Sequence, residues 1–249
     1  MGGDDHMSRR RFFAPPSAFN FGKRIVTLTS DEARHLREVL RLKPGDGVQV
    51  FDGAGREFRA VVLHARRESA ELELGDEIAP QRPESPLDLT LAVALLKGEK
   101  FDLVVQKGTE LGVNRFIPLV TRFADIRLRD EADASKRVTR WQRIALEAAK
   151  QSGRAVVPEI TLPETLESVI RENSCLLFSE RQGERLNTDL KTQSLIAVVG
   201  SEGGWSDEEL DQARAEGVPI VTLGGRVLRA ETAAIATAVL LQHRYGDLK

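Results

Sequence analysis

The segments LIAVVGSEGGW (residues 195–205) and PIVTLGGRVLRAETAAIAT (residues 219–237) decide how the rest of the chain is interpreted. Each begins with a short apolar run that is typical of a buried strand. Each run then breaks at glycines, which let a backbone approach a ligand closely. In open α/β sheets, ligands bind at the carboxyl ends of the strands. Two glycine loops after two strands therefore predict one pocket built largely from backbone, although either loop alone could be an ordinary turn.

The chain lacks the familiar phosphate-binding patterns. It contains no G-x-x-x-x-G-K-[ST] segment and no G-x-G-x-x-G segment after a strand, which excludes a P-loop and the dinucleotide fingerprint. No lysine stands beside the first glycine loop to hold a phosphate. A ligand bound mainly by backbone, without a phosphate anchor, fits a nucleoside-like cofactor such as S-adenosylmethionine. The missing P-loop also argues against a nucleotide-dependent hydrolase.

The charge distribution is more informative than the net charge of −2 over 249 residues. Residues 9–67 hold 13 Lys and Arg against 6 Asp and Glu, and residues 97–154 hold 13 against 8. Two basic regions in a nearly neutral chain predict a charged face for a polyanion. The alternative is an ordinary solvated surface.

Several features bound the class of protein. Cys175, the only cysteine, lies in an apolar run and is expected to be a buried core residue rather than a nucleophile. Four scattered histidines with one cysteine predict no metal site. No apolar run approaches the roughly 20 residues that span a bilayer, and no signal peptide is visible, so a cytoplasmic location is expected. We expect residues 1–8 to be a disordered leader.

Residues 9–79 are expected to form a small barrel-like domain. Segments 48–51, 57–63 and 71–74 have strand patterns, and Asp-Gly-Ala-Gly at 52–55 predicts a hairpin between the first two. A helix is expected from a capping box formed by Thr29 and Glu32. Its apolar face comprises Ala33, Leu36, Val39 and Leu40. Its other side carries Arg34, Arg37 and Arg41, here called the arginine stripe. This stripe suits a nucleic-acid backbone, and an ordinary surface helix is equally compatible.

Residues 80–86 (PQRPESP) are expected to be a linker to a second domain, residues 87–249, in which strands and helices alternate as a mostly parallel sheet requires. Strands are expected at 87–96, 115–121, 174–178, 195–199 and 220–223. Helices are expected at 99–111, 135–152, 162–171, 206–217 and 231–244. The last helix is apolar almost all round, which predicts deep burial or a subunit interface.

Six segments resemble those of the RsmE-type 16S ribosomal RNA uridine N3-methyltransferases of the SPOUT, or α/β-knot, superfamily. They occur in the same order and are spread along nearly the whole chain from Arg10. The segments are RRFF (10–13), HLREVLRLKPGD (35–46), KGEKFDLVVQKGTELGVNRFIPL (97–119), EAAKQSGRAVVPEI (147–160), VGSEGGWSDEEL (199–210) and TLGGRVLRAETA (222–233).

The resemblance implies an α/β fold with a small N-terminal PUA-like β-barrel for RNA. It also implies a C-terminal SPOUT domain with a deep trefoil knot and a mostly parallel sheet. The implied cofactor is S-adenosyl-L-methionine, the implied substrate is 16S ribosomal RNA or the 30S subunit, and the implied assembly is a homodimer without metal or membrane. The alternative is a non-catalytic RNA-binding or ribosome-assembly factor with the same fold, from which cofactor binding would distinguish the enzyme.

The resemblance also implies which residues form the cofactor pocket. They come from three segments of the chain, and Glu231 is expected to support them. These residues are Leu177, Phe178, Ser179, Val199, Gly200, Glu202, Gly203, Gly204, Leu223, Gly224, Arg226, Val227, Leu228, Arg229 and Thr232. The RNA contacts are expected from basic residues and one amide. These are Arg9, Arg10, Arg34, Arg37, Arg41, Lys97, Lys100, Lys107 and Gln151.

Methylation of uracil N3 requires loss of the N3 proton, and charge develops on O2 and O4. A fixed cation near those oxygens stabilises the transition state. Arg229 is the first candidate because it stands beside the second glycine loop, and Arg154 is the second, with Gln151 as a reader of the base edge. Glu202 and Glu231 are candidate proton acceptors, although either could bond backbone donors instead. The base must be unpaired or flipped out, because N3 lies on its Watson–Crick edge.

Overall fold

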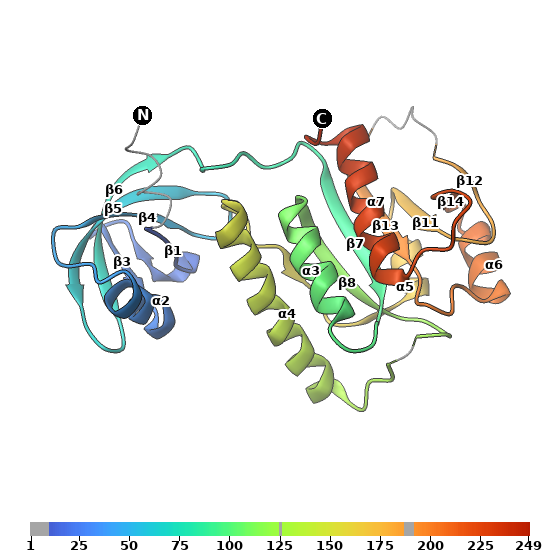
Figure 1. Cartoon of the computed structure of the whole chain (residues 1–249), viewed down its shortest axis with the longest axis horizontal. Helices are drawn as coiled ribbons and strands as arrows, with labels where there is room; N and C mark the ends of the chain where they lie inside the picture. Colours follow the sequence, from blue (N-terminus) through green and yellow to red (C-terminus); the bar gives the residue numbers. More distant parts are fainter. Residues whose placement is uncertain (1–9, 125, 187–191) are drawn as a thin grey trace. The chain divides into compact units, whose positions relative to one another are not determined.

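The computed structural model describes residues 10–124, 126–186 and 192–249. By its internal contacts the chain forms two compact units (Figure 1). The N-terminal unit comprises residues 1–84 together with Ala149–Val157, and the C-terminal unit comprises Ser85–Ala148 with Pro158–Lys249. The predicted Arg9 contact lies outside the described residues.

The N-terminal unit is a six-stranded mixed sheet that curls into a half-barrel. Its strands are β1 (Arg11–Phe13), β2 (Phe19–Asn20), β3 (Ile25–Leu28), β4 (Gly47–Phe51), β5 (Glu57–Ala65) and β6 (Ala70–Ile78), in the order β1-β4-β5-β6-β3-β2. A short 3-10 helix, η1 (Pro16–Ala18), precedes β2. Asp52 Oδ1 accepts the backbone N–H groups of Ala54 and Arg56 at 2.8 and 3.0 Å, and Gly53 has φ 77°. The predicted hairpin is therefore confirmed, and this turn chemistry explains it.

The first helix differs from the prediction. It consists of α2 (Ser30–Arg34) followed by a π-helical turn, η2 (His35–Val39). Thr29 is the N-cap residue, but its side chain makes no capping hydrogen bond, so the predicted capping box is wrong. In the π-turn, Leu40 N–H bonds to the carbonyl of His35, five residues back, at 3.0 Å. This wider turn changes the angular spacing, and Val39, expected in the apolar face, is 66% exposed.

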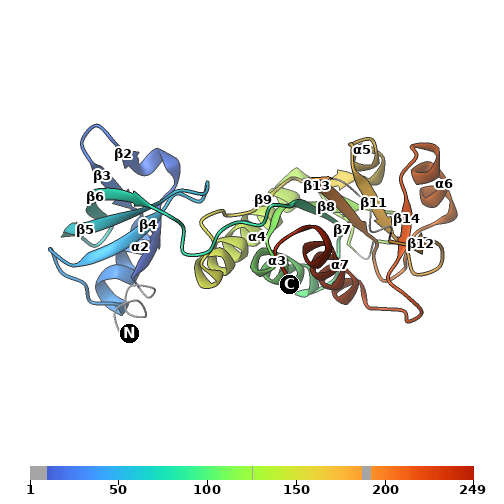
Figure 2. The same ribbon diagram turned by 90° about the horizontal axis from the view of Figure 1, so that it is seen from above.

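The C-terminal unit is built on an all-parallel sheet. Its strands are β7 (Asp88–Ala94), β8 (Val113–Val120), β9 (Glu159–Ile160), β10 (Glu164–Thr165), β11 (Cys175–Phe178), β12 (Glu184–Arg185), β13 (Ser194–Val199) and β14 (Ile220–Thr222). The order is β10-β8-β7-β13-β11-β14-β12, and β9 pairs with β8. Val199 is in register with Val93 and with Phe178, and Phe178 is in register with Val221. The loops that follow these strands therefore emerge at one edge of the sheet (Figure 2).

Helices cover both faces of this sheet (Figure 2). They are α3 (Lys100–Glu110), α4 (Glu131–Ser152), α5 (Leu166–Ile170), α6 (Asp207–Ala215) and α7 (Ala230–Tyr245), where the last residues of α4 group with the N-terminal unit. α3 packs beside α7, and α5 beside α6. Within the described part of the chain, no helix has the length and apolar character that crossing a membrane requires.

Two helix boundaries correct the prediction. The helix expected at 162–171 is only α5, because β10 takes Glu164 and Thr165 into the sheet, and the Thr165 hydroxyl then accepts Ser168 N–H at 3.3 Å as the cap. The helix expected from residue 135 begins at Glu131, where Asp130 Oδ1 accepts Asp133 N–H at 2.8 Å. By contrast, the capping box at Ser206 and Glu209 that opens α6 is confirmed.

Candidate cofactor pocket

A pocket opens at the carboxyl edge of the parallel sheet, where the two glycine loops meet the start of α7. Its empty space, including the open solvent at its mouth, is about 480 Å³. The lining comes from the ends of β11, β13 and β14 and from the first turn of α7. It consists of Phe178, Ser179, Glu180, Val199, Gly200, Ser201, Thr222, Leu223, Gly224, Arg226, Leu228, Ala230 and Ala233.

The first glycine loop is short because its backbone folds onto itself and onto a buried indole. Gly204 N–H bonds to the Ser201 carbonyl at 3.0 Å, and Gly204 adopts φ 68°. A Cβ on Gly200 would lie 3.0 Å from the ring of Trp205. That ring is fixed, since Trp205 Nε1 donates to the Phe178 carbonyl at 2.8 Å. The ends of β11 and β13 are thereby held together around the pocket.

The loop after β8 packs against the first glycine loop. Ser201 Oγ donates to the Phe123 carbonyl at 2.8 Å, and a Cβ on Gly203 would lie 2.7 Å from the Cβ of Phe123. Glu209, which closes the capping box of α6, also accepts Arg122 N–H at 2.9 Å through its Oε1. The need for glycine at 203 is therefore a close approach between two backbones.

The second glycine loop is open to solvent. Gly224 has φ 124°, and no heavy atom lies within 4 Å of a Cβ built there or on Gly225. Val227 is 82% exposed. The loop ends at Arg229, which is the N-cap residue of α7. The side chain of Arg229 is exposed. This loop leaves room for a ligand on its inner side.

The structure brings together about half of the residues expected to bind cofactor. Those that line the pocket are Phe178, Ser179, Val199, Gly200, Leu223, Gly224, Arg226 and Leu228. Those that do not line it are Leu177, Glu202, Gly203, Gly204, Val227, Arg229 and Thr232. Leu177 is fully buried in the core. Ser201, which lies inside the expected span 199–204, also lines the pocket. The lining residues missing from the expectation are Glu180, Thr222, Ala230 and Ala233. They end a strand, follow one or lie in the first turn of α7, which is a signal that strand-end reasoning could have used.

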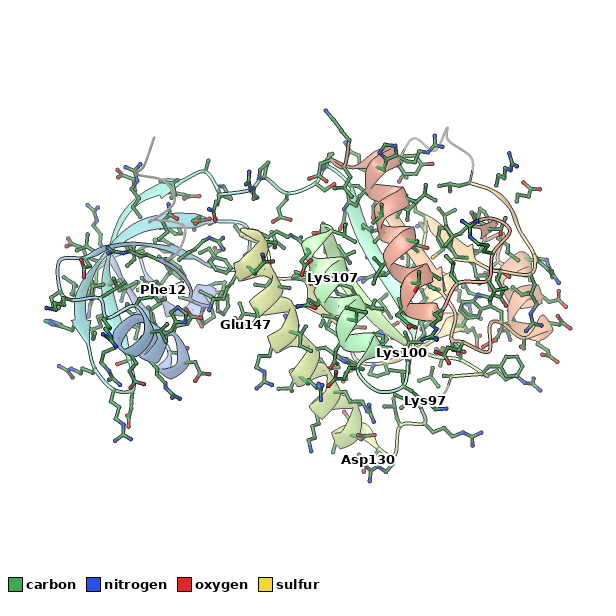
Figure 3. All side chains as sticks on the ribbon, viewed as in Figure 1. Phe12, Lys97, Lys100, Lys107, Asp130 and Glu147 are labelled. Carbon is green, nitrogen blue, oxygen red and sulfur yellow. The ribbon has the colours of Figure 1, made fainter. Side chains whose placement is uncertain are left out.

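A charged cluster lies beside the pocket. Lys100, the first residue of α3, forms an ion pair with Glu202 of the first glycine loop, and its Nζ lies 3.7 Å from Oε2 of Glu231 in the first turn of α7. Glu231 Oε2 is buried and has no hydrogen-bond partner among the described residues. Lys100, labelled in Figure 3 at the start of α3, was expected to hold phosphate. It is instead engaged with two carboxylates.

Arg154 and Gln151 belong to the N-terminal unit, not to the unit that holds the pocket. Arg154 is 5% exposed, and its Nε and Nη2 donate to Glu84 Oε2 at 2.9 and 2.6 Å. Its carbonyl accepts Arg11 Nη2 at 2.9 Å, and Arg11 is itself paired with the buried Glu57. This network fixes residues 149–157 on the half-barrel. Gln151 is exposed.

The expected RNA contacts are mostly surface cations. Arg34 and Arg37 both donate to Glu38, and these two hydrogen bonds hold the pKa of that carboxyl below its usual range. Other members of the expected set are placed as follows. Arg10 lies 3.7 Å from Asp46, Arg41 and Lys97 are exposed, and Lys107 pairs with Glu110 at 2.9 Å.

Cys175 is a core residue, as expected. It is 5% exposed, and its Sγ donates to the carbonyl of Val169 at 3.2 Å. Burial, reinforced by Glu172, raises the pKa of the thiol from 9.0 to about 11. The thiolate that a nucleophile needs is therefore scarce near neutral pH.

Two family matches assign the chain, with its all-parallel sheet, its glycine-loop pocket and its half-barrel, to a class of RNA-modifying enzymes. The RNA methyltransferase domain family matches residues 83–242, and the RNA methyltransferase PUA domain family matches residues 28–75. The chain belongs to the family of ribosomal RNA small subunit methyltransferase E. The relative of that name from Synechocystis is 38% identical over 84% of this chain and 69% of its own.

Solved structures agree with this membership. Ribosomal RNA small subunit methyltransferase E from Neisseria gonorrhoeae, bound to S-adenosyl methionine, is 32% identical with a TM-score of 0.84 and covers 96% of this chain and 99% of that one. A methyltransferase from Legionella pneumophila with bound cofactor SAM is 30% identical with a TM-score of 0.85, and covers the same shares.

Proposed function

We propose that this protein is a cytoplasmic S-adenosylmethionine-dependent methyltransferase that methylates N3 of a uridine in small-subunit ribosomal RNA, on the 30S subunit. The observation that carries the proposal is the pocket between the two glycine loops, with a charged cluster beside it. Relatives of the same family with similar folds hold S-adenosyl methionine. The residues present fit that group, because the lining combines an apolar floor, at Phe178, Leu223 and Leu228, with glycine backbone and small side chains. Such a lining suits a nucleoside with an aliphatic tail.

When bound, the cofactor supplies an electrophilic methyl group. The chain's own residues have three tasks: to hold the base, to accept its N3 proton, and to stabilise the charge that spreads to O2 and O4. Arg229 is assigned the third task, since its exposed side chain stands at the N-cap of α7 beside the second glycine loop. A fixed cation aimed at developing charge is worth about 10²–10³ in rate.

Glu202 is assigned the second task, which is to accept the N3 proton. Its side chain is 42% exposed, whereas that of Glu231 is 13% exposed, so Glu202 is the more accessible of the two carboxylates to a base. Lys100 contacts both and thereby orients Glu202 from a third element. Arg154 is retained as a second charge-stabilising candidate, and it must leave Glu84 before it can act on a base.

The assembly is proposed to be a homodimer whose interface includes α7, and the fold is proposed to contain the trefoil knot of the superfamily. The support for the dimer is the apolar surface of α7, where Val239 is 41% exposed and Ile235 and Leu240 are only partly buried. The support for the knot is the strand order, in which β13 lies between β7 and β11 while β14 lies beyond β11.

The decisive experiment supplies labelled S-adenosylmethionine with unmodified small-subunit ribosomal RNA and, separately, with 30S subunits from a strain lacking the modification. We expect label in 3-methyluridine on nucleoside mass analysis. Label in another nucleoside would refute the N3 assignment but not the enzyme class. RNA binding without cofactor binding or transfer would favour an assembly factor and refute the enzymatic proposal.

A further inference from the structure

We propose that the C-terminal unit carries its own phosphate-binding track, which leads an unpaired RNA strand to the pocket. The track consists of cations on the loop after β8 and on the exposed face of α4. They lie in the basic region 97–154, but none was among the individual residues expected to contact RNA. Its members are Arg122, Arg127, Arg129, Lys136, Arg140 and Arg143. The inference rests on the proposed function for the identity of the polyanion and deepens it by naming where the backbone is held.

The track begins at the pocket. β8 ends at the same sheet edge as β13, because both pair in parallel with β7, with Leu119 opposite Ala94 and Val199 opposite Val93. The loop that leaves β8 is then tied to the first glycine loop by the Ser201–Phe123 hydrogen bond of 2.8 Å. Cations that follow residue 123 are therefore anchored to the loop that lines the cofactor site.

The track continues along one face of α4, whose labelled neighbours in Figure 3 are Asp130 before its start and Glu147 near its end. The inward face is buried, at Trp141 and Ala145, whereas Lys136, Arg140 and Arg143 are exposed. From residue 134 to residue 146 the helix contains no carboxylate. Lys136 and Arg143 are two turns apart, a span of about 10 Å at 1.5 Å per residue. A backbone laid along this face of the helix can therefore contact both cations.

Three of the acidic residues near the track have local structural roles. Asp130 and Asp133 are at the N-terminus of α4, where the helix dipole favours negative charge, and Asp130 caps that end. Asp102 forms an ion pair with Arg140 and accepts a hydrogen bond of 3.0 Å from the indole N–H of Trp141. Arg140 is nevertheless 54% exposed on its side chain.

Four cations of the track have no carboxylate partner among the described residues: Arg127, Arg129, Lys136 and Arg143. Arg122 pairs at 3.3 Å with Glu208, and both side chains are at least 60% exposed, so solvent screens this pair. On the side of the sheet covered by α5 and α6, Arg171 and Arg214 each pair with acidic residues of the same surface. The track thus contains four unneutralised cations, as the attraction of a polyanion requires.

The test uses full-length protein and a short unpaired RNA containing uridine, with affinity measured from 50 mM to 300 mM salt. The variant is Lys136→Ala with Arg143→Ala, which favours the helix because alanine is the best helix former. Its matched control is Arg171→Ala with Arg214→Ala, which removes the same charge from exposed positions on the side of the sheet that α5 and α6 cover. Cofactor affinity and melting temperature are measured on both as checks of folding.

We expect the α4 variant to reduce the slope of log affinity against log salt by about 1.4, because each phosphate contact to a single strand releases about 0.7 counterion. If the plots of log affinity against log salt for the wild type and the α4 variant meet at 1 M salt, the variant binds RNA about 25-fold more weakly at 0.1 M salt. The control should keep the wild-type slope. Equal slopes for variant and control would overturn the track, since net charge alone would then explain the binding. An unchanged α4 variant would overturn it too.

Failure of the proposed function gives a different pattern. A wild-type protein that binds RNA with a steep salt slope, weakened only in the α4 variant, but transfers no methyl group would leave the track standing and refute the enzyme. A wild-type protein that methylates RNA while the α4 variant binds normally would refute the track alone. Preferential binding of an acidic peptide over RNA would also refute it.

Discussion

Replacing Gly203 by alanine tests whether the contact between the first glycine loop and the loop after β8 shapes the pocket. The added Cβ would lie 2.7 Å from the Cβ of Phe123 and 3.5 Å from its carbonyl oxygen. Carbon atoms pack best at about 3.5–4.0 Å, so the two segments must separate by about 1 Å. The neighbour is attached directly to backbone and cannot rotate out of the way.

The magnitude follows from two effects. Overpacking of this kind costs about 1–3 kcal/mol. The same displacement strains the Ser201–Phe123 hydrogen bond of 2.8 Å, which is worth about 1 kcal/mol. A total of about 2–4 kcal/mol lowers the melting temperature of a chain this long by about 4–16 °C. Because Ser201 and Gly200 line the pocket, part of the distortion reaches the ligand, and a loss of about 1.4 kcal/mol in binding is tenfold in Kd.

The assay is scanning calorimetry with and without S-adenosylhomocysteine, and titration calorimetry for the affinity. Gly225→Ala is the matched control, since it also adds a methyl group to a glycine loop but meets no atom within 4 Å and has no positive φ. We expect Gly225→Ala to melt within about 2 °C of wild type, as surface substitutions usually do. Equal melting temperatures and affinities for the two variants would refute the close-approach reasoning.

Three further predictions follow from the structure. Arg229→Ala should reduce single-turnover methyl transfer by about 10² or more, with little change in RNA affinity. Alanines at all three positions of the arginine stripe should instead weaken RNA binding and reduce its salt dependence. The reverse pattern would contradict the assignment of catalysis to Arg229 and of RNA binding to the stripe. Val239→Glu should give folded monomer in sedimentation, because Val239 is 41% exposed, whereas Leu241→Glu should unfold the chain, because Leu241 is fully buried; a Val239→Glu dimer would exclude this interface. Burial raises the pKa of Cys175 from 9.0 to about 11, so the folded state holds the thiol proton more tightly than the unfolded state. Its contribution to stability should be complete below pH 9 and lost as the pH rises toward 11, and denaturant titrations of Cys175→Ala should show a shallower decline across that window.

The sequence by itself determined the features that depend on local chemistry. Apolar runs at 195–199 and 220–223 had to be buried strands, and the glycines after them marked the pocket edge. The capping box at Ser206 and the hairpin turn at Asp52 were also readable, because side chains there bond to backbone two to four residues away. The buried thiol of Cys175 followed from its apolar neighbours. In each case the stabilising partner is close in sequence.

Only the tertiary structure determined the contacts between residues that are far apart in the chain. Lys100 resembled a phosphate ligand, but α3 places it against Glu202 and Glu231, about 100 and 130 residues away. Arg154 was named as a candidate for its charge alone, and only the structure shows that it is buried against Glu84, 70 residues earlier, because residues 149–157 pack with the N-terminal unit. The periodicity of apolar residues predicts which face of a regular helix is buried against one neighbouring element. A long-range ion pair obeys no periodicity, because its energy depends on distance and burial in space rather than on separation along the chain.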